Sequence, residues 1–265
     1  MKKRFGFTLA EVLITLGIIG VVAAMTIPTL IQNTNSVKFA SQFKKSISTL
    51  SQAALMSQAQ YDIDYSLLDK VSSDDDCATD VVSDTAKQSM CGLFNSTLAG
   101  KVYQGAYGTV KLGNATDKYE IKGPGGGDAT PTVAFTNYLI YALSDGSWVG
   151  FNPNAKKCSV APGTVLDETK LKGSADGNLV NCLGFIDVNG ATGPNEEVSC
   201  ANASATKASL KGSDECALGS TAGSVSDVYP ILFHDGTVEP ATNAAKAVLA
   251  RGKSNTQTQQ SGGNH

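Results

Sequence analysis

The feature that most constrains the fold is an apolar run near the start of the chain, in which Glu11 is the only charged residue between Phe7 and Ile31. About 21 of these residues, 7–27, would form a helix about 31 Å long, which matches the hydrocarbon thickness of a bilayer. Basic residues precede the run, and the positive-inside rule places them in the cytoplasm: Lys2, Lys3 and Arg4. We therefore expect residues 7–27 to span a membrane, with the rest of the chain on its far side.

Other interpretations of this run are open: a cleaved secretory signal, a plain single-pass anchor and a buried core helix. A secretory signal would be cut after its apolar stretch, and Val22-Ala23-Ala24 could serve as a small-residue site. However, an ionised Glu11 inside lipid costs about 2.5–3.5 kcal/mol and so implies a partner. The helical pattern also continues past the membrane. A core helix is disfavoured because so long an apolar run has no polar face.

The residues at the start of the run, Gly6-Phe7-Thr8-Leu9-Ala10-Glu11, resemble the prepilin cleavage and methylation motif of type IV pilins and type II secretion pseudopilins. The resemblance implies that a prepilin peptidase cuts between Gly6 and Phe7 and methylates the new amine of Phe7. It also implies that Glu11 is the family's glutamate, and that Pro28 is the proline that many type IV pilins carry in this helix. The implied partners are other copies, related pilins and an inner-membrane assembly platform.

The motif also has a physical reason. After cleavage Phe7 would carry a cationic amine in the membrane, where it is as costly to bury alone as the Glu11 carboxylate. A neighbouring subunit displaced along a filament can bring its Glu11 to this amine, so that the two charges neutralise and set the register of assembly. Further along, Pro28 cannot donate a hydrogen bond to the carbonyl of Ala24, which predicts a helix break there.

Beyond the membrane segment, apolar residues recur every three or four positions as far as about Tyr61, which predicts an amphipathic continuation of the same helix. This stripe of apolar residues should pack against a head domain. The expected organisation is a leader at 1–6, a stalk helix at 7–61, a globular head at 62–242, and a short helix with a disordered tail at 243–265.

Strand signals dominate the head from residue 101 onward. Two β-rich runs are each interrupted by Asp-Gly, at 145–146 and at 235–236, and these predict β-hairpins because Asp-Gly suits a tight turn with positive φ. The pattern also predicts a helix within 79–98 and strands at 102–112, 119–122 and 183–188. The expected fold class is α+β and pilin-like, with a long N-terminal helix packed against a C-terminal antiparallel sheet.

Cysteines are spread over the region beyond the apolar run, and none stands in a C-x-x-C pair: Cys77, Cys91, Cys158, Cys182, Cys200 and Cys216. An even number of cysteines outside the cytoplasm favours disulfides. A zinc site is the competing interpretation, but the only histidines are His234 and His265. The simplest pairing joins neighbours: Cys77 with Cys91, Cys158 with Cys182, and Cys200 with Cys216.

The stretch 187–195, followed by Asp227 and a strand, resembles a C-terminal pattern in bacterial pilin-like proteins. Oxygens of Asp187, Asn189 and Asp227 could bind calcium, as some secretion pseudopilins do in this region. An EF-hand is not matched, because no glutamate follows at the required offset. A turn stabilised by its Asn-Gly and Gly-Pro steps is the alternative, and turn chemistry favours it. No other cofactor is expected.

Composition and motifs argue against two classes of function. A net charge of −3 argues against electrostatically driven binding of nucleic acid. Without a G-x-S-x-G or H-E-x-x-H motif we expect no enzyme.

We expect a structural subunit of a type IV pilus or a type II secretion pseudopilus, held in the inner membrane by one span before assembly, with a periplasmic or extracellular head. The N-terminal motif does not separate these two. The alternatives are a minor tip subunit for adhesion or DNA uptake and, less favoured, a membrane-anchored extracytoplasmic enzyme.

Overall fold

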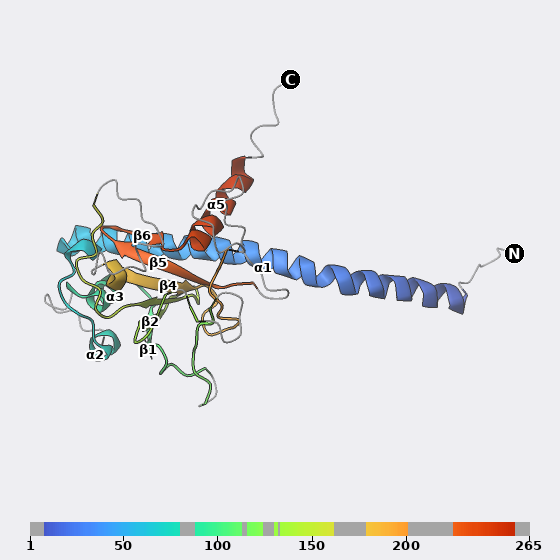
Figure 1. Cartoon of the computed structure of the whole chain (residues 1–265), viewed down its shortest axis with the longest axis horizontal. Helices are drawn as coiled ribbons and strands as arrows, with labels where there is room; N and C mark the ends of the chain where they lie inside the picture. The colour runs from blue at the N-terminus through green and yellow to red at the C-terminus, as the bar shows by residue number, and fades with distance from the viewer. Residues whose placement is uncertain are drawn as a thin grey trace, which may run out of the picture.

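A long helix projects from a head that is built on a β-sheet (Figure 1). The computed structural model describes residues 8–79, 88–112, 116–123, 130–131, 133–161, 179–200 and 225–257. The leader 1–6, the predicted cleavage residues Gly6 and Phe7, and Cys216 lie outside the described residues.

The long helix, α1, comprises Leu9–Tyr61 and is 53 residues long. It begins after Thr8, whose side chain caps the first turn. It ends because Asp62 adopts a left-handed conformation with φ 56° and turns its N–H back to the carbonyl of Gln58, at 3.0 Å. The end of the helix coincides with the end of the apolar periodicity in the sequence.

The helix does not break at Pro28. That residue lies inside α1, so the predicted break is wrong for the isolated chain. Proline removes a single intrahelical hydrogen bond, and the regular helix on both sides of it keeps α1 continuous. Proline is tolerated in this way in many membrane helices. Near Pro28, the hydroxyl of Thr26 donates to the carbonyl of Val22 at 3.0 Å, so a side chain adds a hydrogen bond to the backbone of this part of the helix.

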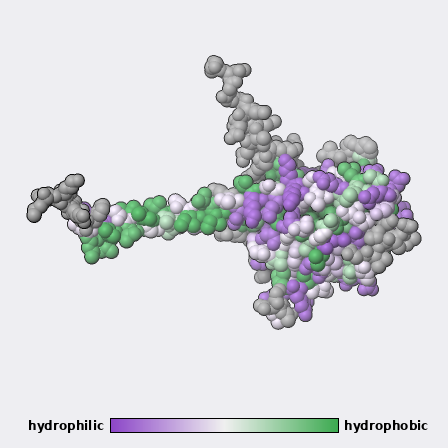
Figure 2. Space-filling view, turned by 180° about the vertical axis from the view of Figure 1, so that it is seen from behind, coloured by the Kyte–Doolittle hydropathy of each residue, from purple (hydrophilic) through white to green (hydrophobic). Residues whose placement is uncertain are grey.

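The first half of α1 projects from the head, and its visible face is mostly apolar in Figure 2. Its large apolar side chains are exposed, among them Leu9, Leu13 and Ile19. The 20 residues Leu9–Pro28 are long and apolar enough to cross a membrane, by length and composition, and none of this segment is buried inside the structure. The second half of α1 lies on the head and buries one face, which includes Phe39, Phe43 and Leu50. The two halves therefore match the predicted change from an apolar to an amphipathic helix.

The described strands form one antiparallel sheet in which every strand pairs with the next one in sequence. They are β1 (Val102–Ala106), β2 (Leu139–Ala142), β3 (Trp148–Phe151), β4 (Leu183–Asp187), β5 (Val228–His234) and β6 (Thr237–Pro240). Both predicted hairpins are present, as β2–β3 and β5–β6. The fold is α+β and pilin-like, as expected.

Helix α1 covers one face of the sheet and lies beside β6 (Figure 1). The ring of Phe43 stacks on that of Tyr229 in β5, with centroids 4.3 Å apart. Near the C-terminal end of the helix, Ser51 Oγ accepts a hydrogen bond from the backbone N–H of Val238 in β6, at 3.0 Å. These contacts fix the stalk to the head along several turns.

Short helices close the rest of the head. They are η1 (Tyr65–Leu67), α2 (Asp74–Ala78), α3 (Met90–Thr97), η4 (Leu179–Cys182) and α5 (Asn243–Gln257). Helix α3 falls inside the helical region predicted at 79–98. Helix α5 packs on α1 and lies in the segment 243–265, where a short helix followed by a disordered tail was expected.

The opposite face of the sheet carries a second buried cluster that the sequence pattern does not predict. Its strand residues are Ile140, Trp148, Phe185 and Val228, and the chain between β1 and β2 covers them with Val110, Tyr119, Ile121, Phe135 and Tyr138. We call these residues the back-face cluster. Two predicted strands differ from the structure here. The strand predicted at 102–112 ends at Ala106. The strand predicted at 119–122 makes only isolated bridges, such as Lys122 with Glu196, because this segment lies over the face of the sheet.

Candidate functional site

Two regions carry the residues singled out in the sequence, and the first is the start of α1. Thr8 and Glu11 form a reciprocal cap there. The backbone N–H of Thr8 donates to Glu11 Oε2 at 2.8 Å, the Thr8 hydroxyl donates to the same oxygen at 2.9 Å, and Thr8 Oγ1 accepts from the Glu11 N–H at 3.3 Å. The Glu11 carboxylate is thus folded back toward the N-terminus of the helix.

Sequence reasoning missed the role of Thr8, although its signal was present. A threonine followed three residues later by glutamate, ahead of an apolar run, is the pattern of a capping box. Such a cap satisfies backbone N–H groups that the first turn of a helix would otherwise leave without a partner. Thr8 therefore fixes where α1 begins and where the Glu11 carboxylate points.

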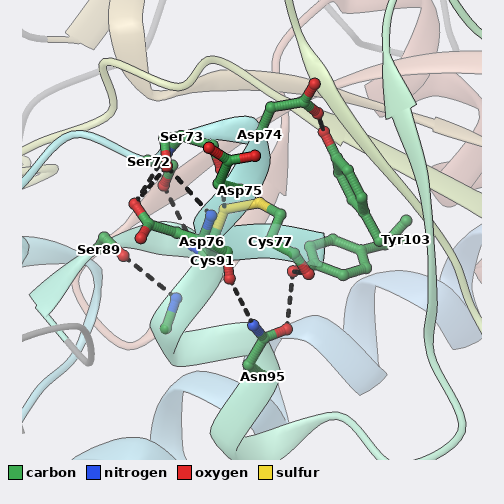
Figure 3. The surroundings of a disulfide bond; sticks show 12 residues. Ser72, Ser73, Asp74, Asp75, Asp76, Cys77, Ser89, Cys91, Asn95 and Tyr103 are labelled. Atoms are coloured by element: carbon green, nitrogen blue, oxygen red, sulfur yellow. Dashed lines mark hydrogen bonds between the residues drawn. A yellow bond between two sulfur atoms is a disulfide. The ribbon is translucent and has the colours of Figure 1, made fainter. Parts of the chain in front are cut away.

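A disulfide between Cys77 and Cys91 joins α2 to α3, with Cα atoms 5.0 Å apart (Figure 3). Around it, Asn95 donates its side-chain amide to the carbonyl of Asp76 at 3.1 Å. The hydroxyl of Tyr103, on β1, donates to the Asp74 carboxylate. Helix α2 is therefore attached to both α3 and the edge strand of the sheet.

A second disulfide joins Cys158 to Cys182, with Cα atoms 5.7 Å apart. Both bonds are the neighbour pairings predicted from the sequence. Cys200 is also disulfide-bonded. Its predicted partner Cys216 lies outside the described residues, so that pairing stays a prediction.

The second region lies where β4 ends and β5 begins, and it brings together the three calcium candidates of the sequence. Asp187 Oδ1 accepts a hydrogen bond from the backbone N–H of Asn189 at 3.2 Å. The amide of Asn189 donates to the Asp227 carboxylate. Asp227 also receives the N–H groups of Asn195, at 3.0 Å, and Glu196, at 2.7 Å. The carboxylate of Asp227 thus ties the turn after β4 to the start of β5.

The carboxylates of Asp187 and Asp227 are fully buried, and burial sets their acidity. Burial, followed by the negative charge of Asp227, raises the pKa of Asp187 well above its ordinary value. Burial also raises the pKa of Asp227, to about 6, although hydrogen bonds from Glu196 and Asn195 act against it. The ionised forms of Asp187 and Asp227 therefore lack solvent, and either a proton or a cation would relieve that cost.

The donors at this turn suit a hard cation only if amide and carbonyl oxygens take part. Among the described residues, no group of three or more His, Cys, Asp or Glu side chains is arranged to hold a metal. Two buried amide oxygens of the turn, Asn189 Oδ1 and Asn195 Oδ1, have no hydrogen-bond donor in the described structure. Calcium accepts such oxygens beside carboxylates, so the residues present fit this ion.

Comparison with known proteins bears on the first region alone. A family model described as the prokaryotic N-terminal methylation motif matches residues 1–27. This motif is the signature of type IV pilins and pseudopilins, and together with the apolar helical segment Leu9–Pro28 it fits a membrane-anchored precursor. Neither the comparison with curated proteins nor that with solved structures gives a match.

Proposed function

We propose that the chain is a structural subunit of a type IV pilus or a type II secretion pseudopilus. The observation that carries this proposal is the methylation motif at the start of a helix whose segment Leu9–Pro28 is apolar and uncovered. An apolar surface of this size needs either lipid or other protein around it. The membrane covers it before assembly, and the same helices of other copies cover it in the filament.

Assembly acquires its register from Glu11. In the isolated chain this carboxylate is held by Thr8 at the tip of α1. Cleavage after Gly6 places a cationic amine on Phe7, close in sequence to that tip. In the filament Glu11 accepts the amine of a neighbouring copy, because neither charge is tolerated alone in an apolar bundle.

The partners and locations follow from this role. The precursor meets a prepilin peptidase and an assembly platform in the inner membrane, and then related pilins or other copies in the filament. The head lies in the periplasm or outside the cell, an oxidising environment in which the disulfides Cys77–Cys91 and Cys158–Cys182 persist. The role requires no catalytic residue.

The test separates processing from assembly. Mass spectrometry of the mature chain should find an N-terminus at Phe7 with one added methyl group. Glu11→Ala should be processed normally yet fail to enter filaments. Thr15→Ala is the matched control, since the Thr15 hydroxyl bonds only the carbonyl of Val12 one turn away, at 3.0 Å, and it should assemble. Normal filament yield from Glu11→Ala would contradict the pairing with the amine.

A deletion strain distinguishes the kinds of filament. Loss of long surface fibres on deletion identifies a major pilin. Loss of protein secretion with surface fibres intact identifies a pseudopilin. Intact fibres that no longer adhere or take up DNA identify a minor tip subunit.

A further inference from the structure

The part of α1 that lies on the head has one side that the head leaves uncovered. Between residues 37 and 59 the buried side chains recur every three or four positions, and the exposed ones lie on the other side of the helix. We call the exposed residues of this segment the open side of α1. It includes Lys38, Lys44 and Lys45, together with the apolar residues Val37, Leu55 and Met56.

The charges of the open side are all positive. Apart from Glu11, every acidic residue of the chain lies within 62–242, so α1 beyond its membrane segment carries lysines and no carboxylate. Helix α5, which packs on α1, adds Lys246, Arg251 and Lys253 and has no acidic residue either. Figure 2 shows the helix changing from hydrophobic to hydrophilic where it meets the head. The chain is thus divided into basic helices and an acidic head.

One lysine of the open side has an anionic partner, and two have none in the described structure. Nζ of Lys45 lies 3.3 Å from Asp145 Oδ2 in the β2–β3 turn. No ion pair among the described residues includes Lys38 or Lys44. An exposed lysine is satisfied by water, but a lysine covered by another protein is costly unless it is paired. A protein that covers the open side must therefore bring carboxylates to Lys38 and Lys44.

The apolar residues of the open side favour a protein as its partner. Val37 is 65% exposed, Leu55 54% and Met56 41%, so apolar side chains stand at both ends of the open side with lysines between them. A free anion or a lipid headgroup would satisfy the lysines alone, whereas a protein surface covers both kinds of residue. In the proposed filament, other copies surround the first half of α1, and the open side continues that same helix.

Asp62, the residue that ends α1, is a carboxylate suited to Lys44. It is exposed, and its side chain has no hydrogen bond or ion pair among the described residues. It follows Lys44 by about five turns, or about 27 Å of helix, so the two residues lie on the same side of α1. Parallel copies displaced by this length bring Asp62 of one beside Lys44 of the other. The pairing of Glu11 with Phe7 needs only about 6 Å, so this copy stands several steps further along the filament.

We propose that the open side of α1 is the surface on which a second copy of this chain docks its acidic head, with Asp62 of that copy paired to Lys44. The inference rests on the proposed filament role and adds a contact to it. Glu11 sets the register between the tips of neighbouring helices, and Lys44 sets it between more distant copies. Two open sides carry the same charge and repel each other, which favours contact between an open side and a head.

The first experiment is cross-linking of purified filaments with a carbodiimide, which joins a lysine amine to a carboxylate in contact with it. We expect the amide links Lys44–Asp62 and Lys45–Asp145, identified by mass spectrometry of peptides. Because α1 is one continuous helix, Lys44 and Asp62 of a single copy are about 27 Å apart, so their link can only join two copies. Of the two links, monomers in detergent should give only Lys45–Asp145.

The link between Lys45 and Asp145 is the internal control, since it forms within one copy. Filaments that give this link but none between Lys44 and Asp62 overturn the inference and leave the proposed function standing. If the chain enters no filament at all, the proposed function fails, and the inference fails with it.

Charge reversal tests whether the contact matters to assembly. Lys44→Glu should lower the filament yield at least about 10-fold, because it sets two carboxylates against each other. Cleavage and the Tm of the head should not change, since Lys44 is exposed in the isolated chain. Adding Asp62→Lys to this variant restores opposite charges and should recover the yield.

Lys118→Glu is the matched control for the reversal. It changes an exposed lysine on the segment that covers the opposite face of the sheet, and it should assemble normally. Normal yield from Lys44→Glu overturns the pairing. A double variant that assembles no better than Lys44→Glu alone also overturns it.

Discussion

The ring of Phe185 on β4 covers Gly150, its register partner on β3, so closely that no side chain fits at residue 150. A Cβ built on Gly150 would lie 2.1 Å from Phe185 Cε1. Phe185 is fully buried, and its ring also packs against the rings of Tyr119, Phe135 and Tyr138 in the back-face cluster. The missing side chain of Gly150 thus provides the room in which this cluster forms.

We predict that Gly150→Ala destabilises the head strongly. The added methyl group would overlap the Phe185 ring, which cannot move away because other aromatic rings surround it. Overpacking of this kind costs about 3 kcal/mol, and for a domain of this size the Tm should fall by on the order of 10 °C. Thermal unfolding followed by the fluorescence of Trp148, which lies in the same cluster, measures the change.

Gly20→Ala is the matched control for this substitution. A Cβ at Gly20 meets nothing within 4 Å in the isolated chain, so the Tm of the head should not change. A combination of Gly150→Ala with Phe185→Leu tests the cause, because a smaller side chain at 185 relieves the overlap. The double variant should lose less stability than the sum of the two single variants. Simple additivity would contradict the proposed clash.

We predict that the Cys158–Cys182 disulfide stabilises the head more than the Cys77–Cys91 disulfide does. In the chain-entropy account each bond contributes about 3 kcal/mol, and the difference in loop length adds only about 0.5 kcal/mol. The backbone of Cys158 is also bound to two other segments. Its N–H donates to the carbonyl of Tyr65 at 3.0 Å, and its carbonyl accepts from the N–H of Asp235 at 2.8 Å. The Cys158–Cys182 disulfide therefore fixes a residue on which two further segments depend.

Paired Cys→Ser variants, unfolded in urea, measure the two contributions. The variant that lacks Cys158 and Cys182 should lose the larger free energy of unfolding. It should also unfold with a single transition, because the segments held by Cys158 belong to the main core. A larger loss from the Cys77 and Cys91 pair would show that α2 and α3 matter more to the head than these backbone contacts.

The parts of the fold that local sequence specifies were predictable. The apolar run and its periodic continuation gave the extent of α1, and Asp-Gly at 145–146 and 235–236 gave the two hairpins. The back-face cluster was not predictable, because it depends on contacts between distant residues. The hydrogen bond from Tyr119 to Asp187, for example, joins positions 68 residues apart. The isolated chain has no break at Pro28, because proline weakens a helix only locally, and unwinding there in a filament stays a prediction.

The candidate site was predictable to a similar degree. The oxygen-bearing side chains Asp187, Asn189 and Asp227 stood out in the sequence, and the structure brings them together. The hydrogen bond from Tyr119 to Asp187 could not be read from the sequence, since a buried tyrosine is most simply a core residue. The bonds from the Asn189 amide to the carbonyls of Thr192 and Gly193 were equally hidden, because every residue has a backbone carbonyl and only the folded turn shows where it points.

The β2–β3 turn stabilises the head in a pH-dependent way. Asp145 Oδ1 accepts the N–H and the hydroxyl of Ser147, at 3.1 and 2.6 Å, and Oδ2 lies 3.3 Å from Nζ of Lys45 on α1. Burial alone would raise the pKa of Asp145, but the bonds from Ser147 and then Lys45 outweigh it and lower the pKa below 3.8. The ionised carboxylate therefore stabilises the fold above pH 3.8, and this contribution is lost as the pH falls through the lowered pKa.

Asp145→Asn should consequently reduce the free energy of unfolding by about 1 kcal/mol at neutral pH, and the gap to the unmodified chain should close in strong acid. Urea unfolding at a series of pH values measures it. Lys45→Gln is the matched control for the ion pair. Its side chain is 64% exposed, so its removal should cost only a few tenths of a kcal/mol, roughly, and less in high salt. If Lys45→Gln were as costly as Asp145→Asn, the ion pair rather than the bonds within the turn would be the main source of stability.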